Sequence, residues 1–154
     1  MADMDRNEVK TFPELTTQEL FQIYKLRVAV FVVEQKCYYQ EVDDDDLIAY
    51  HLMFKDSQNE LTAYARIIPE KNATIARIGR VVVNPNHRGG GLGRELVQAA
   101  LDRIPSLMPH TAKIVLAGQE YLNEFYKSFG FKNVSDVYLE DGIPHIDMEM
   151  PLTD

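Results

Sequence analysis

The stretch from residue 75 to residue 94 joins an apolar strand, a glycine-rich turn and the start of a helix, and it constrains the fold more than any other feature. Residues 75–83 are rich in β-branched side chains and end at Asn84-Pro85-Asn86, which stops a strand. The turn reads Arg88-Gly89-Gly90-Gly91-Leu92-Gly93, and an amphipathic pattern follows it to about Ile104. The first N–H groups of a helix have no partner within it, and the helix dipole is positive there, so this order predicts an anion site.

The spacing of the glycines excludes two common phosphate sites. A Walker A loop ends in Gly-Lys-Ser/Thr, whereas here Gly93 is followed by Arg94-Glu95. The dinucleotide fingerprint requires a third glycine three residues after the second, and that position is Leu96 or Arg94. Glycines let the backbone approach a pyrophosphate, and the flanking arginines supply positive charge. The residues alone therefore indicate a ligand that carries phosphate, with a purely structural turn as the alternative.

A second motif follows the next predicted strand. It reads Phe125-Tyr126-Lys127-Ser128-Phe129-Gly130-Phe131, and it places Tyr126 on an apolar helix face. Packing explains such a tyrosine unless a ligand lies beside it. The two motifs, Arg-x-x-Gly-x-Gly after an apolar strand and Tyr-x-x-x-Gly-Phe after the next one, together make the chain resemble the GNAT N-acetyltransferase superfamily.

Further segments resemble the ElaA-like branch of GNAT proteins. They are residues 26–35 with Cys37 and Gln40-Glu41, and residues 138–146. The resemblance runs from about Thr16 to Met150. It implies an α+β chain with a GNAT-like (acyl-CoA N-acyltransferase) fold, in which a mixed central β-sheet is flanked by helices. It does not name the acceptor.

By this resemblance, acetyl-CoA is the co-substrate, and its acetyl group passes directly to a primary amine of a small molecule or a protein. Tyr126 would be the catalytic acid that protonates the departing thiolate, as a phenol can in a dry site. The strand before the loop would pair with the pantetheine arm, and one of its N–H groups would polarise the thioester carbonyl. Family members often carry asparagine where this chain has Gln119. The implied cofactor-binding residues are Val81, Val82, Val83, Arg88, Gly89, Gly90, Gly91, Leu92, Gly93, Arg94 and Gln119.

The acceptor ammonium must lose a proton before it attacks, so a base is needed. Glu34, Glu41, His51, His145 and a water chain are the candidates, and no sequence feature chooses among them. Two other functions stay open. One is a CoA-binding regulatory or interaction module with little turnover, and the other is an acyltransferase that uses a longer acyl-CoA.

Hydrophobic periodicity predicts the other elements. Thr16 and Glu19 form a capping-box pattern before a helix over residues 20–31. Pro105 and Pro109 are expected to close the helix after the glycine turn, and Gly130 to end a helix over residues 120–129 with Tyr121 on its apolar face. The run Val81-Val82-Val83 is typical of a strand buried on both faces. Strands are predicted over residues 47–54, 61–68, 75–83, 113–117, 131–139 and 146–150.

The 154 residues fit one domain, residues 1–154. With 24 Asp and Glu against 16 Lys and Arg, the net charge is −8, which disfavours nucleic acid and membrane partners and mildly favours a cationic one. The single Cys37, expected to be a buried or half-buried thiol, and the lack of a signal-peptide pattern predict a cytoplasmic protein. No metal is expected, because the histidines lack metal-ligand spacing, and a homodimer is left open. The four aspartates of residues 43–46 are interpreted as a solvated acidic loop.

Overall fold

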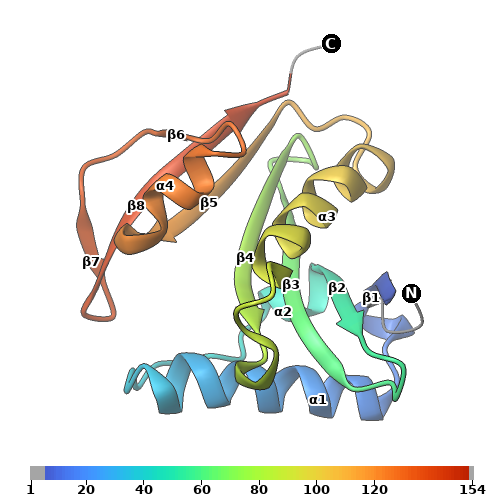
Figure 1. Cartoon of the computed structure of the whole chain (residues 1–154). Helices are drawn as coiled ribbons and strands as arrows, with labels where there is room; N and C mark the ends of the chain where they lie inside the picture. Colours follow the sequence, from blue (N-terminus) through green and yellow to red (C-terminus); the bar gives the residue numbers. More distant parts are fainter. Residues whose placement is uncertain (1–5, 153–154) are drawn as a thin grey trace.

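The computed structural model describes residues 6–152 and shows one eight-stranded sheet with helices on both faces (Figure 1). The strand order is β1-β2-β3-β4-β5-β8-β6, and the short β7 also pairs with β8. Within the described residues β4 and β5 form the one parallel pair, and every other pair is antiparallel. The prediction of an α+β chain with a mixed central sheet is therefore confirmed. The strands are β1 (Arg6–Thr11), β2 (Tyr50–Lys55), β3 (Leu61–Glu70), β4 (Ile75–Val83), β5 (Lys113–Gln119), β6 (Lys132–Asn133), β7 (Tyr138–Glu140) and β8 (Ile143–Pro151).

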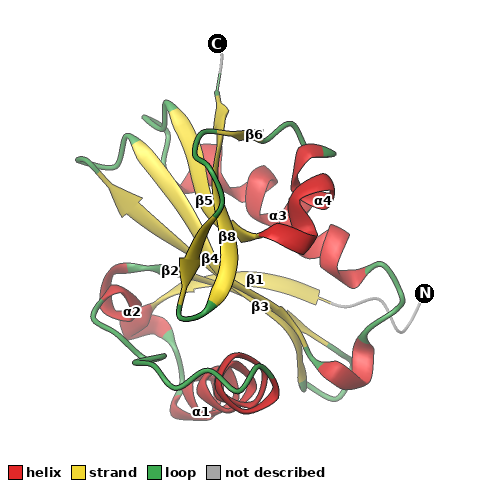
Figure 2. Cartoon of the chain, turned by 90° about the vertical axis from the view of Figure 1, so that its left-hand side faces the viewer, coloured by secondary structure: helices red, strands yellow, loops and turns green. Residues whose placement is uncertain are grey.

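The helices divide between the two faces of this sheet (Figure 2). On one face lie α1 (Thr17–Arg27), its π-helical continuation (Val28–Glu34) and α2 (Asp45–Ile48). On the other lie α3 (Leu92–Leu107) and α4 (Asn123–Lys127). Short 3-10 turns span Phe12–Glu14, Pro85–His87 and Glu120–Leu122.

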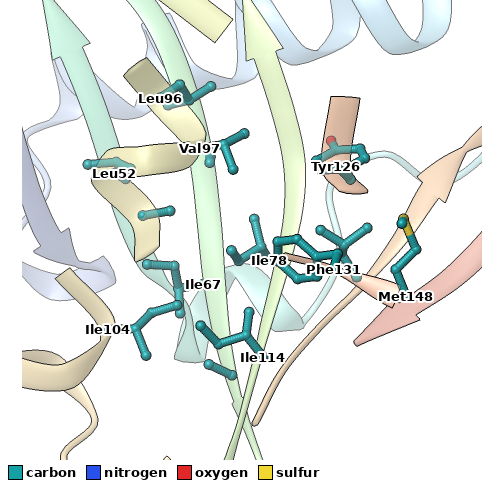
Figure 3. Close-up of a cluster of buried hydrophobic side chains, with 14 of the residues drawn as sticks. Leu52, Ile67, Ile78, Leu96, Val97, Ile104, Ile114, Tyr126, Phe131 and Met148 are labelled. Carbon is teal, nitrogen blue, oxygen red and sulfur yellow. The ribbon is translucent and has the colours of Figure 1, made fainter. Parts of the chain in front are cut away.

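Side chains alternate along each strand, so each face of the sheet has its own apolar cluster. The larger cluster packs α3 and α4 onto the sheet, and Figure 3 shows Leu96, Ile78 and Phe131 within it. A smaller cluster packs α1 against the other face, where Ile23 contacts residues such as Tyr64. Both helix layers are therefore held by apolar burial, which contributes about 25 cal/mol per Å².

The start of α1 confirms the predicted capping box. The backbone N–H of Glu19 donates to the side-chain oxygen of Thr16 at 3.0 Å, and the N–H of Thr16 donates to the Glu19 carboxylate at 2.8 Å. Glu19 is itself buried and also accepts hydrogen bonds from Lys10 and Lys55, which come from β1 and β2. The cap thus attaches the helix to the sheet as well as starting it.

β4 and β5 separate midway along the sheet. Their parallel pairing joins residues 75–77 to residues 113–115, and these two fully described strands do not pair beyond that point. Here the register between β3 and β4 shifts between Tyr64 and Arg66, and Arg80 takes a left-handed conformation with φ of 52°. Such an irregularity bends and twists a strand, so the carboxyl halves of β4 and β5 diverge (Figure 1).

A buried group of charges joins α1 and α2 to the sheet. Arg27, fully buried at the end of α1, donates from Nη1 to Asp46 at 2.7 Å and from Nε to Glu41 at 2.6 Å. Asp46 also accepts from Nη1 of Arg66 at 2.9 Å. Burial by itself would raise the pKa of Asp46, but the guanidinium groups of Arg27 and Arg66 outweigh burial and hold that pKa below its usual value.

These contacts show that the interpretation of residues 43–46 as a solvated acidic loop is wrong in part. Asp43 is half-buried and forms ion pairs with Arg66 at 2.7 Å and with Arg80 at 3.3 Å. Asp46 is buried, whereas Asp44 and Asp45 are exposed as expected. The reason is that arginines from α1, β3 and β4 converge on this loop, which no local pattern reveals.

Three strand predictions also need correction. The strand predicted over residues 47–54 begins at Tyr50, because residues 45–48 form α2. The strand predicted over residues 131–139 is wrong: only β6 and β7 form there, and β8 begins at Ile143 instead of residue 146. The edge strand β1 is absent from the prediction, because its alternation of polar residues around Val9 is typical of a loop as well.

The predicted helices exist with different ends. The helix predicted over residues 20–31 is α1 with its π-helical continuation, and α3 continues past Pro105 to Leu107. Pro105 is exposed in the last turn of α3, where its missing N–H disturbs only the helix end. In residues 120–129 a 3-10 turn precedes α4, so Tyr121, predicted on the apolar face, is 77% exposed.

We expect Asp46→Asn to lower the free energy of unfolding by about 3 kcal/mol, because it leaves Arg27 and Arg66 without their shared buried carboxylate. The matched control is Asp45→Asn, whose exposed side chain predicts a change within about 0.5 kcal/mol. Urea unfolding at pH 7 measures both. Because the folded-state pKa of Asp46 is depressed, its contribution is present above the unfolded pKa of about 4 and is lost as pH falls through the folded pKa. The difference in free energy of unfolding between wild type and Asp46→Asn should therefore shrink in acid. A difference that stays constant with pH would contradict this account.

Candidate active site

A cleft of about 950 Å³ lies where β4 and β5 diverge. Its walls come from both faces of the sheet, with α4 on one face and the segment between α1 and α2 (residues 28–44) on the other. The end of the glycine turn and the β7–β8 hairpin also line it. The following residues with predicted site roles line this cleft: Val81, Val82, Val83, Arg88, Gly93, Gln119 and Tyr126.

The glycine turn has the conformation that an anion site requires. Gly89 and Gly91 have φ of 90° and 80°, and Gly91 is the N-cap of α3 without a side-chain cap. A Cβ built on Gly89, Gly90 or Gly91 would meet no heavy atom within 4 Å, so the turn faces open space. The N–H groups of the first turn of α3 are therefore accessible, and they fit a pyrophosphate group.

The two arginines beside the turn are held by other groups. Arg88 makes a two-pronged ion pair with Glu34, with Nη2–Oε1 of 2.7 Å and Nη1–Oε2 of 2.9 Å. Its hydrogen bonds hold the pKa of Glu34 below the usual value. Arg94 lies over the rings of Phe129 and Phe125, 4.6 and 5.4 Å from their centroids. The charge of Arg88 is thus paired with a carboxylate, whereas Arg94 has no ion-pair partner in the described residues and adds its charge to the potential of the backbone N–H groups.

The end of β4 presents its backbone to the cleft. Val82 is buried towards α1, whereas Val81 and Val83 are half-buried on the α3 face. The prediction that this run is buried on both faces is therefore right only for Val82. Because β5 no longer pairs with β4 here, the β4 backbone on this side has no strand partner and can pair with an extended ligand.

Leu92 does not contact the cleft. Its side chain is buried in the core beneath α3, so its backbone N–H alone is available to a ligand.

Tyr126 lies in the wall of the cleft opposite β4. Its ring packs edge-on against Phe125 and Phe131, with centroids 5.3 and 6.1 Å away. Figure 3 shows Tyr126 and Phe131 in this core. It also covers Gly118, where a Cβ would lie only 3.1 Å from Cδ2 of Tyr126. Within residues 6–152 no side chain or backbone group is hydrogen-bonded to its hydroxyl. Burial raises the pKa of Tyr126 to about 12, so the phenol stays protonated at neutral pH and can donate.

Gln119 and Cys37 mark the other side of the cleft. Gln119 ends β5, and its Nε2 donates to Oε1 of Gln35 at 3.4 Å. The Cys37 thiol is buried, as expected, and donates to the carbonyl of Asp141 in the β7–β8 turn at 3.0 Å. This contact connects the segment between α1 and α2 to the hairpin across the cleft.

The structure separates the four candidate bases. His51 is fully buried outside the cleft, and both its ring nitrogens are hydrogen-bonded, to the Tyr64 hydroxyl and to the Asp46 carbonyl. Glu41 is buried among Arg27, Arg80 and Tyr39. Glu34 lines the cleft but is paired with Arg88. His145 lines the cleft from β8.

Sequence analysis does not assign several residues of the cleft wall. Arg66, Arg80, Glu140 and Asp141 line it, brought there by β3, β4 and the β7–β8 hairpin. Each is a charged residue in a strand or turn, a pattern that surface residues share. Their places depend on the bulge in β4 and on the hairpin, neither of which periodicity predicts.

Known proteins match this chain along nearly its whole length. A family model described as an acetyltransferase (GNAT) domain matches residues 3–152. A UPF0039 protein of Schizosaccharomyces pombe is 50% identical over 143 residues, covering 93% of this chain and 95% of the relative. The chain belongs to the GNAT acetyltransferase family.

Two solved structures are similar along nearly the whole chain. The crystal structure of Escherichia coli ElaA has a TM-score of 0.88 at 39% identity, covering 96% of this chain and 99% of that one. A Pseudomonas aeruginosa acyl-CoA N-acyltransferase has a TM-score of 0.87 at 41% identity, covering 94% and 99%. The GNAT-like fold and the resemblance to the ElaA-like branch are thus confirmed. GNAT proteins transfer an acyl group from an acyl-CoA to an acceptor, so the family indicates an acyltransferase.

No helix in residues 6–152 has both the length and the apolar composition needed to cross a membrane. The same stretch contains no group of three or more His, Cys, Asp or Glu side chains placed to hold a metal ion.

We expect Gly91→Asp to weaken coenzyme A binding at least about tenfold more than Gly91→Asn, as measured by isothermal titration calorimetry. Both side chains must adopt the left-handed conformation of Gly91, which Asn and Asp tolerate. Only aspartate places a negative charge at the turn, where it would repel a pyrophosphate. Equal affinities for the two variants would contradict the assignment of the turn as the phosphate site.

Proposed function

We propose that this GNAT chain is an N-acetyltransferase that transfers the acetyl group of acetyl-CoA directly to a primary amine. The observation that carries the proposal is the cleft in the divided sheet. An accessible helix N-terminus lies at one end of it, a buried neutral phenol lies in its wall, and acidic groups lie at the other end. Residues 1–154 would form one catalytic domain, and its composition favours the cytoplasm.

The charges at the end of the cleft away from the glycine turn favour an amine. Asp45 and Asp141 line it, are exposed and have no ion-pair partner in the described part of the chain. Glu140 is also exposed, and its carboxylate lies 3.8 Å from Nε2 of His145. The arginines of the same wall are paired with acids: Arg66 with Asp43 and Asp46, Arg77 with Glu70, and Arg80 with Glu41 and Asp43. The uncompensated charge is therefore negative and attracts an ammonium group.

Each part of the cleft would have one task in the transfer. The turn at residues 88–93 with Arg94 would bind the pyrophosphate, and the free backbone of Val81, Val82 and Val83 would align the pantetheine arm. A β4 N–H would polarise the thioester carbonyl, and Gln119 would contact the arm from β5. The acyl-CoA supplies an activated carbonyl and a thiolate leaving group. Tyr126 would give its proton to the sulfur as the C–S bond breaks.

The direct test of the proposal is release of free thiol from acetyl-CoA, followed with a thiol-reactive dye. We expect release only when a primary amine is present, and faster release with diamines or lysine side chains than with neutral nucleophiles such as alcohols. Propionyl-CoA and butyryl-CoA serve as alternative donors. If amine-dependent thiol release occurs only with a longer acyl-CoA, that donor replaces acetyl-CoA in the proposal. Coenzyme A binding without thiol release across a broad amine panel would favour a binding module.

The Tyr126→Phe variant tests the acid. The change keeps the ring contacts with Phe125, Phe131 and Gly118, so the unfolding temperature and coenzyme A affinity should match wild type. We expect kcat to fall about 100-fold, the size of a lost proton donor. Tyr38→Phe, at a 91% exposed position outside the cleft, should leave kcat unchanged. Wild-type kcat in Tyr126→Phe would leave the tyrosine with a packing role only.

A further inference from the structure

His145 occupies a distinctive position among the four histidines, all of which lie in the described residues: it alone lines the cleft. It lies on β8, opposite Gln119 of β5 and Tyr138 of β7 in the register of the sheet. Its ring stacks on that of Tyr138, with centroids 6.2 Å apart and planes 28° apart. It is 8% exposed, so the ring is held firmly in the cleft wall.

The hydrogen bonds of the ring fix which nitrogen carries the proton. Nδ1 lies 2.7 Å from the carbonyl oxygen of Ile143. A carbonyl oxygen can only accept, so Nδ1 must carry the hydrogen. In the neutral ring Nε2 then has a free lone pair. The nearest acidic atom to Nε2 is an Oε2 of Glu140 at 3.8 Å, beyond hydrogen-bond distance.

From this geometry we propose that His145 is the general base that takes a proton from the acceptor ammonium through Nε2. The inference rests on the proposed amine acetylation and names a residue for its deprotonation step. The other three candidate side chains are occupied: Glu34 by Arg88, Glu41 by Arg27 and Arg80, and His51 by two hydrogen bonds outside the cleft.

His145 and Tyr126 flank the opening in the sheet from opposite faces. Side chains alternate along β8, so His145 faces away from Ile146, which packs in the same core as Tyr126. Ile146 is in register with Gly118, the residue that Tyr126 covers. The proposed base and acid therefore lie one residue apart along the β5–β8 ladder. His145 is on the α1–α2 face of the sheet, and Tyr126 is on the α3–α4 face. An amine that approaches from the acidic end meets the base before it meets the thioester.

The proton balance of the step closes with these two residues. An ammonium proton passes to Nε2, and the freed amine forms the C–N bond with the acyl carbon. As the C–S bond breaks, the sulfur takes the phenol proton of Tyr126, and the surplus proton on the amide nitrogen restores the phenol. His145 then returns its proton to water. The reaction yields one amide, one thiol and one released proton.

The surroundings of His145 are rich in carboxylates. Glu140 of the β7–β8 hairpin lies 3.8 Å from its Nε2, and Asp147 follows on β8, where it accepts a hydrogen bond from the Tyr138 hydroxyl at 2.5 Å. From the sheet, Arg77 of β4 is the cation in the same wall, and it is paired with Glu70. Cys37 faces the hairpin from the segment between α1 and α2. Carboxylates thus outnumber unpaired cations around the ring, so this part of the cleft attracts an ammonium group.

The kinetic test compares His145→Asn with wild type. Asparagine can keep the hydrogen bond to the Ile143 carbonyl through its amide, so the hairpin should be preserved, but it has no basic lone pair. We expect kcat/KM for the amine to fall about 100-fold at pH 7, with coenzyme A affinity and unfolding temperature unchanged. The deficit should shrink as pH rises towards the pKa of the amine, because the amine then arrives already deprotonated. His110→Gln, at an exposed position outside the cleft, is the control.

The result that overturns the inference is a His145→Asn deficit that stays constant with pH, or no deficit, while wild type acetylates amines. In that case the proposed function stands and the base assignment fails. If wild type itself releases no thiol with any amine, the proposed function fails and the base assignment fails with it. A readout independent of turnover is the ¹⁵N–¹H spectrum of the histidine rings, assigned by the signal missing in His145→Asn. The neutral ring should be protonated at Nδ1, and protonation at Nε2 would refute the proposal whatever the activity.

Discussion

Beyond residues 77 and 115 the strands β4 and β5 share no hydrogen bonds, and the sheet opens at its centre. Backbone N–H and C=O groups along such an opening must be satisfied by water or by a ligand, since a buried polar group left unpaired costs about 1–3 kcal/mol. The opening therefore persists only because the surrounding structure holds the two strands apart. The glycine turn, Tyr126 and the β7–β8 hairpin all lie where this separation puts them.

The two faces of the sheet hold the opening by different means. On the α3–α4 face the contacts are apolar, and the ring of Tyr126 fills the space above Gly118 that any larger residue would need. On the other face the left-handed Arg80 is tied to Glu41, which in turn binds Arg27. Buried ion pairs add little net stability, because desolvation offsets most of their attraction. Their directional hydrogen bonds instead fix where the segment between α1 and α2 lies against β4, and so the shape of the acceptor end.

How much of this could be predicted from the sequence depends on how local each cause is. The Thr16 cap, the glycine turn and the β2–β3 hairpin follow from residues within a few positions of one another, and the structure has them. Three other features depend on partners far along the chain. They are the short helix α2, the end of the strand predicted over residues 131–139, and the burial of Asp46. Arg66 is 20 residues from Asp46, and Cys37 is 104 residues from Asp141. No periodicity within one window records contacts of that kind.

The same distinction separates the two ends of the site. Backbone groups make up the proposed phosphate end, so a motif of glycines predicts it, and the charge of Arg88 is paired with Glu34. The net charge of the chain is −8, but the field of distant carboxylates is screened over about 8–10 Å at physiological salt. Recognition of an anion therefore depends on the groups within a few ångströms of it, among them the N–H groups of the turn. Side chains from the α1–α2 segment and the β7–β8 hairpin make the acceptor end, and its negative charge is local rather than a property of the whole surface. A thioester carrying phosphates and a cationic amine would thus meet opposite potentials in one cleft. In the proposed reaction this separation would keep the donor out of the acceptor end without any wall between them.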